Sequence, residues 1–159
     1  DVQGGVIFTM GLMQALSGLF LGRIMNWMYK PYFLVAGAFL GVCGMACFLL
    51  AFLGIIGGFW LIGVFYFGAF LFGLYSGSFY FYTGYHCLVH PSKAGFNIAM
   101  NEGMYAIANV LALLLGGVIA DMFGINVPYL LAGLLIVFFT VIQVRQHVKY
   151  PWPKTAMHN

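Results

Sequence analysis

The chain has 159 residues, of which 64% are hydrophobic and 6% are charged, and its formal net charge at pH 7 is +3. A soluble domain carries about 25% charged residues, so this composition excludes a water-soluble globule, and the small, scattered positive charge gives no sign of nucleic acid binding. Lipid as the surrounding solvent accounts for the composition, because the outside of a membrane protein is apolar. The chain is therefore expected to be an integral membrane protein.

Five apolar segments in the sequence are long enough to cross a bilayer, which takes about 20 residues of helix. In chain order, they predict helices at residues 5–21, 32–53, 59–83, 98–123 and 127–144. A glycine-rich turn at 54–58 separates the second helix from the third, and a second tight turn at 124–128, with Pro128 in the first turn of the next helix, separates the fourth from the fifth. The predicted fold is an all-α transmembrane bundle over residues 1–148, followed by a cytoplasmic tail at 149–159.

The basic residues predict the orientation of this bundle. Helices that alternate in direction place the connections after the first and third helices, and the tail after the fifth, on one side. All six basic residues fall there: Arg23, Lys30, Lys93, Arg145, Lys149 and Lys154. By the positive-inside tendency this side is cytoplasmic, with the N-terminus outside and the C-terminus inside the cell (inner) membrane.

Small residues at four-residue spacing predict close helix packing. Gly18 and Gly22, Gly37 and Gly41, and Gly73 and Gly77 each form a GxxxG pair, and the fourth helix has a stripe at Ala108, Ala112, Gly116 and Ala120. Such residues allow two helix backbones to approach in lipid, where burial of apolar area drives association only weakly. A compact bundle is expected.

Polar side chains are concentrated on three of the five predicted helices. The first carries Gln14 and Ser17, the third carries several tyrosines and serines, and the fourth carries Asn101, Tyr105 and Asn109. A polar group in hydrocarbon needs a partner or water. We therefore expect the first, third and fourth helices to surround a polar interior, with the second and fifth outside. Interhelical hydrogen bonding is an equally good explanation for any single one of these residues.

Glu102 is an ionisable residue inside a predicted helix, and such residues are candidate functional sites. It lies about one turn from the cytoplasmic end of its helix, so a structural latch, formed with a basic residue such as Lys93, is favoured slightly over a coupling site. His86 and His90 are interpreted as cytoplasmic loop histidines. The three cysteines show no zinc spacing, and His86 and His90, although four residues apart, have no evident third ligand. Neither a metal nor another cofactor is expected.

Two segments resemble the second half of the major facilitator superfamily. The loop from Gly22 through Arg23 and Asn26 to Lys30 is similar to the family's signature loop, roughly G-x-x-x-D-x-x-G-R/K-R/K, although Asn26 replaces the usual Asp and Tyr29 the usual Gly. The segment at 90–103, with the G-G-x-x-A-D-x-x-G run at 116–124, is similar to the eleventh helix of bacterial members and its flanks.

This resemblance covers nearly the whole chain, as helices eight to twelve, and implies a secondary active transporter of a small solute that works by alternating access. The chain opens at Asp1 and runs directly into an apolar helix, so we expect it to be a piece of a longer polypeptide. The implied partners are the bilayer, the missing N-terminal half, a small-molecule substrate and a coupling ion. The candidate cavity residues are Gln14, Tyr75, Tyr80 and Asn109, with Glu102 for coupling or latching.

Two other classes of function are alternatives to transport. An intramembrane enzyme or haem protein needs a cluster of ionisable or metal-ligating residues at membrane depth, which the sequence lacks, so no enzyme is expected. A non-catalytic membrane scaffold or assembly subunit remains the alternative, because hydrogen bonds between helices produce a similar polar pattern.

Overall fold

The computed structural model describes residues 2–24, 30–88 and 93–149, and the statements below concern these residues. They form five α-helices: α1 (Val2–Leu21), α2 (Pro31–Phe52), α3 (Phe59–Leu88), α4 (Ala94–Phe123) and α5 (Asn126–Lys149). All five are long and apolar enough to cross a membrane, and the described ranges contain no strand. At 1.5 Å per residue the helices are about 30 to 45 Å long, which matches or exceeds a hydrocarbon core of about 30 Å. The all-helical prediction is confirmed.

The two tight turns lie where the sequence predicted them. Gly54 and Gly58 have φ angles of 71° and 63°, and Gly124 has a φ of 95°. An L-residue with a side chain rarely adopts positive φ, so glycine is suited to these positions. Gly124 ends α4 by donating its N–H to the carbonyl of Ala120 at 2.9 Å. Each pair of helices can therefore reverse direction within a few residues.

Three predicted helix ends differ clearly from the observed ones. The third helix was expected to end at residue 83 but continues to Leu88, the fourth begins at Ala94 rather than at 98, and the fifth continues past 144 to Lys149. The predicted ends marked where hydropathy falls, whereas a helix can extend beyond the hydrocarbon as long as no residue breaks it. His86 consequently lies in the last turn of α3 rather than in a loop, and His90 is outside the described residues.

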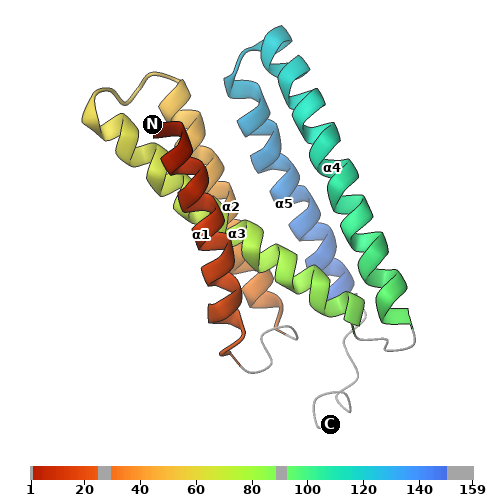
Figure 1. Cartoon of the computed structure of the whole chain (residues 1–159). Helices are drawn as coiled ribbons and strands as arrows, with labels where there is room; N and C mark the ends of the chain where they lie inside the picture. The colour runs from red at the N-terminus through yellow and green to blue at the C-terminus, as the bar shows by residue number, and fades with distance from the viewer. Residues whose placement is uncertain (1, 25–29, 89–92, 150–159) are drawn as a thin grey trace.

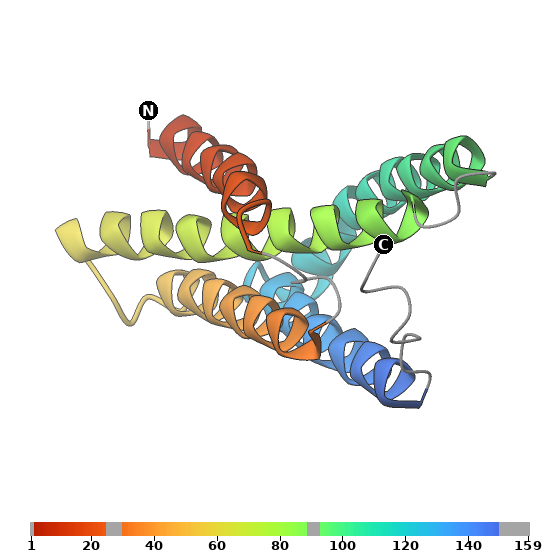
Figure 2. The ribbon, with the colours of Figure 1, turned by 90° about the horizontal axis from the view of Figure 1, so that it is seen from below.

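Helix α3 lies at the centre of the bundle, where it packs against α1 and α2, and it meets α4 near the basic end. Figure 1 shows helices that follow one another along the chain running in alternate directions, so the described basic residues gather at the lower end. Seen from that end in Figure 2, α1 and the N-terminal part of α4 lie on one side of α3, while α2 and α5 lie on the other. At the far end α4 meets α5 through their short turn. The fold therefore surrounds α3 rather than forming a ring.

Glycines make the two main crossings of α3 close. A Cβ atom on Gly73 would lie 2.5 Å from the carbonyl oxygen of Met10 in α1, and one on Gly68 would lie 3.2 Å from the carbonyl oxygen of Gly44 in α2. Backbone meets backbone at both places, as expected for helix association in lipid. The predicted stripe on α4 has no such partner, since a Cβ atom on Gly116 would meet nothing within 4 Å.

The buried core of the described bundle is small. Ala69 of α3 is fully buried, and the aromatic rings of Phe48, Phe52, Phe65 and Tyr129 pack together where α2, α3 and α5 meet, with centroids 5.1 to 6.2 Å apart. Large apolar side chains are exposed on all five helices. An apolar surface this extensive is suited to lipid and not to water. The chain is thus a multi-pass membrane protein.

Candidate functional site

Most serine and threonine hydroxyls within the described helices bond to their own helix. Ser17, Ser78 and Thr140 donate to the carbonyls of Gln14, Leu74 and Ile136 at 2.6 to 2.7 Å. Thr9 and Thr83 donate in the same way, to carbonyls three or four residues earlier in the chain. This back-bonding satisfies a hydroxyl without any partner helix. The hydroxyls of these residues therefore do not by themselves mark a polar cavity.

A polar cluster joins α3 to α4 near the basic end. The Tyr80 hydroxyl donates to Oε1 of Glu102 at 3.0 Å, and the Tyr80 and Tyr105 rings meet edge to face with centroids 5.7 Å apart. The hydrogen-bond partner of Glu102 in the structure is thus Tyr80. Two of the candidate residues, Tyr80 and Glu102, lie together in this cluster.

The same face of α4 continues from this cluster toward the middle of the helix. Glu102, Tyr105 and Asn109 are three and four residues apart, so their side chains share one face. Asn109 lies halfway along α4 and is exposed, and none of the residues of α4 is buried. The described chain therefore leaves this polar stripe largely uncovered.

Gln14 and Tyr75, the remaining cavity candidates, lie on other surfaces of the bundle. The backbone of Gln14 faces α3 at Gly77, where a Cβ atom would lie 2.9 Å from the Cα atom of Gln14. The Tyr75 ring lies against α2 at Gly41, 2.6 Å from the position of a Cβ atom there. Tyr75 and Tyr80 are five residues apart and so emerge about 140° apart around α3. The four candidates are not brought to a single site.

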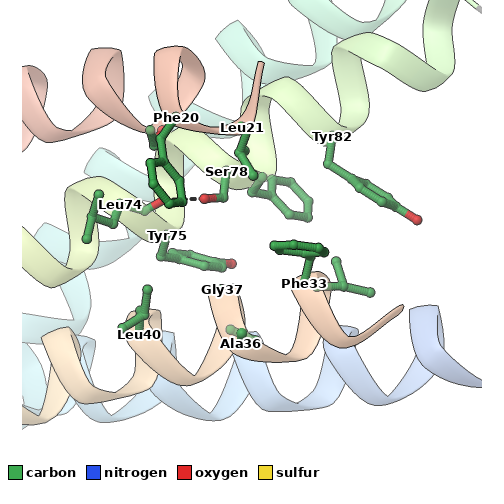
Figure 3. A pocket seen from close by; sticks show the side chains of 14 residues that line it. Phe20, Leu21, Phe33, Ala36, Gly37, Leu40, Leu74, Tyr75, Ser78 and Tyr82 are labelled. Atoms are coloured by element: carbon green, nitrogen blue, oxygen red, sulfur yellow. Dashed lines mark hydrogen bonds between the residues drawn. The ribbon is translucent and has the colours of Figure 1, made fainter. Parts of the chain in front are cut away.

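A pocket of about 210 Å³ lies between α1, α2 and α3 (Figure 3). It is mainly apolar, and its walls include Phe20 and Leu21 of α1, Phe33 and Gly37 of α2, and Tyr75 of α3. The sequence predicts a polar interior formed by the first, third and fourth helices, whereas this mainly apolar pocket, with α2 as one wall, was not predicted. Hydropathy could not identify α2 as a wall because its contribution is aliphatic, aromatic and glycine surface. The one available signal was Gly37 and Gly41, whose lack of side chains leaves room opposite α3.

The signature-loop residues lie at the basic end of the bundle. Gly22 donates its N–H to the Gly18 carbonyl at 2.9 Å, Arg23 is exposed, and Lys30 precedes the first turn of α2 with its Nζ 5.9 Å from the centre of the Tyr32 ring. Asn26 is outside the described residues. No group of three or more His, Cys, Asp or Glu that could hold a metal occurs in the part of the chain that the structure describes.

Comparison of the chain with protein family models, with curated proteins and with solved structures finds no match.

Proposed function

We propose that this chain is part of the membrane domain of a secondary active transporter, corresponding to helices eight to twelve of a major facilitator-type fold. In that arrangement two helical halves rock around a site near the middle of the membrane. The chain would contribute one wall of the central cavity, and another bundle of the same protein would contribute the other.

The polar stripe on α4 is the observation that carries this proposal. Moving an amide from water to hydrocarbon without a hydrogen bond costs roughly 2 to 7 kcal/mol, so the exposed Asn109 needs water or a polar partner at membrane depth. Tyr80 bonds Glu102 at one end of the stripe, but Asn109 is exposed in this bundle. A water-filled cavity facing α4 meets this requirement and is what alternating access needs.

The arrangement of the helices supports the same proposal. Near the basic end, α1 and α4 lie on one side of α3, with α2 and α5 on the other (Figure 2). The three helices that carry most of the polar side chains can therefore contribute to one surface. In this interpretation Asn109 and Tyr105 line the solute pathway, and the Tyr80–Glu102 bond is broken or made as the halves move.

A cysteine accessibility experiment tests the proposal without knowledge of the substrate. In the full-length protein, with Cys43, Cys47 and Cys87 replaced by Ala, Asn109→Cys is expected to react with a membrane-impermeant maleimide in intact membranes. Leu111→Cys is the matched control, since it lies at similar depth on the opposite face of α4 and is also exposed in the chain. We expect Leu111→Cys to remain unlabelled, because that face contacts lipid.

The alternative function, a membrane scaffold or assembly subunit, predicts a different result. There the polar stripe would pack dry against another helix, and Asn109→Cys would be as unreactive as Leu111→Cys. That result would exclude a water-filled pathway along α4 and would favour the scaffold.

A further inference from the structure

The pocket between α1, α2 and α3 differs in chemistry from the polar stripe on α4. Ser17 and Ser78 line it, but both hydroxyls already donate to carbonyls of their own helices at 2.7 Å. Figure 3 shows the oxygen of Tyr82 directed away from the other labelled side chains. The rest of the wall is largely aliphatic and aromatic. A polar solute would lose its hydration here with little in return, so the transported solute is not the expected occupant.

The size and position of the pocket favour a chain-like apolar ligand. An apolar cavity of about 150 Å³ binds benzene, whereas drug-sized ligands occupy about 300 Å³ or more, and this pocket of about 210 Å³ lies between the two. Phe20 at its wall is 67% exposed on the outside of the bundle. A ligand that extends from the surrounding lipid into the pocket satisfies both observations.

Two cations lie next to the pocket along the chain. Arg23 is two residues beyond the wall residue Leu21, and Lys30 is three residues before the wall residue Phe33; both cations are exposed at the basic end of the bundle. Basic residues beside a gap between membrane helices attract anionic lipid head groups. The apolar pocket is thus placed to bind the acyl tail of a lipid, and the two cations are placed to bind its head group.

We propose that this pocket binds an acyl chain of an anionic phospholipid from the leaflet on the basic side, with its phosphate near Arg23 and Lys30. The bound chain would fill the space between α1 and α2 and hold both against α3. This site depends on the membrane location of the chain but not on the proposed transport function.

Photocrosslinking tests the proposal in the full-length protein reconstituted into nanodiscs. The probe is phosphatidylglycerol with a diazirine on its acyl chain, and crosslinked peptides are located by mass spectrometry. We expect labelling of residues 17–21, 33–40 and 74–82. Gly37→Leu should fill the pocket and lower this labelling several-fold. Ala36→Leu, at an exposed wall position, should also lower it and provides a second variant if Gly37→Leu does not fold.

The head group is tested with matched lipids and variants. Labelling by phosphatidylglycerol should exceed labelling by phosphatidylcholine carrying the same diazirine chain. Replacing both Arg23 and Lys30 by Gln should abolish that excess, whereas Lys93→Gln, another exposed cation at the same end, should preserve it. Equal labelling by the two lipids, labelling outside the pocket, or labelling unchanged in both Leu variants would overturn the proposal. The accessibility of Asn109→Cys would be unaffected by such a failure, so the two proposals can fail separately.

Discussion

The Tyr80 hydroxyl and the Glu102 carboxylate form a side-chain hydrogen bond between α3 and α4, two helices that otherwise meet over a limited region. The bond is exposed within the described bundle, so its energy is modest. Measured side-chain hydrogen bonds between membrane helices average about 0.6 kcal/mol. The bond therefore joins two elements without locking them, as expected of a contact that changes during a conformational cycle.

A double-mutant cycle measures this bond. Tyr80→Phe and Glu102→Ala in the full-length protein are expected to show a coupling energy of about 0.6 kcal/mol, in line with other membrane helix pairs, in reversible unfolding within bicelles. Tyr105→Phe paired with Glu102→Ala is the control and should show little coupling, since Tyr105 contacts Tyr80 through its ring. Equal coupling in both cycles would contradict the assignment of the bond to Tyr80.

The side chain of Gly77 is a single hydrogen atom, which allows α1 and α3 to touch. A Cβ atom there would collide with the Ser17 hydroxyl and lie 2.5 Å from the Gln14 carbonyl oxygen of α1. Gly77→Ala should therefore destabilise the protein by about 1 to 3 kcal/mol, the usual cost of overpacking. Gly63→Ala, in the same helix with nothing within 4 Å of its Cβ position, should be neutral or slightly stabilising. Thermal unfolding in detergent checks both, and a similar loss of stability in the two variants would contradict the close α1–α3 contact.

At the scale of helices and turns, the number of helices and their approximate positions could be predicted from the sequence. Runs of apolar residues mark the segments that lipid must surround, and short turns that contain glycine mark where the chain reverses direction. The ends were less predictable: α3 continues through Tyr85 and His86, because amphipathic side chains at a membrane interface do not break a helix. GxxxG pairs identified some contacts correctly, such as Gly73 and Gly77 against α1, but the spacing alone could not separate these from the unpartnered Gly116.

The turn between α4 and α5 depends on Gly124. Its φ of 95° and ψ of 153° lie in a region that is almost restricted to glycine. Gly124→Ala should cost about 1 to 3 kcal/mol of stability through backbone strain. Gly117→Ala, within α4 with open space around its Cβ position, is the control, and the difference between the two should be visible as a lower melting temperature for Gly124→Ala alone. Equal melting temperatures would show that the turn does not need glycine.

At the scale of the whole molecule, the structure places α3 at the centre and leaves most apolar surface facing outward. The sequence could not predict this arrangement, since nearly every face of every helix is apolar and several packings would satisfy the same pattern. The sequence also could not predict that Tyr75 contacts α2 while Tyr80 contacts α4, because those contacts depend on which helices lie on each side of α3. The gathering of cations at one end is predictable, because it follows from the number of helices and from the connections in which the basic residues lie.

The central claim is that the chain crosses the bilayer five times with its cations on one side, and side-specific cysteine labelling tests it most directly. In the cysteine-free full-length protein, Lys93→Cys and Arg145→Cys should both react with an impermeant maleimide from the cytoplasmic side. Ile55→Cys and Ile125→Cys, in the two tight turns, should react from the outside only. Labelling of Lys93→Cys and Arg145→Cys from opposite sides would contradict the account.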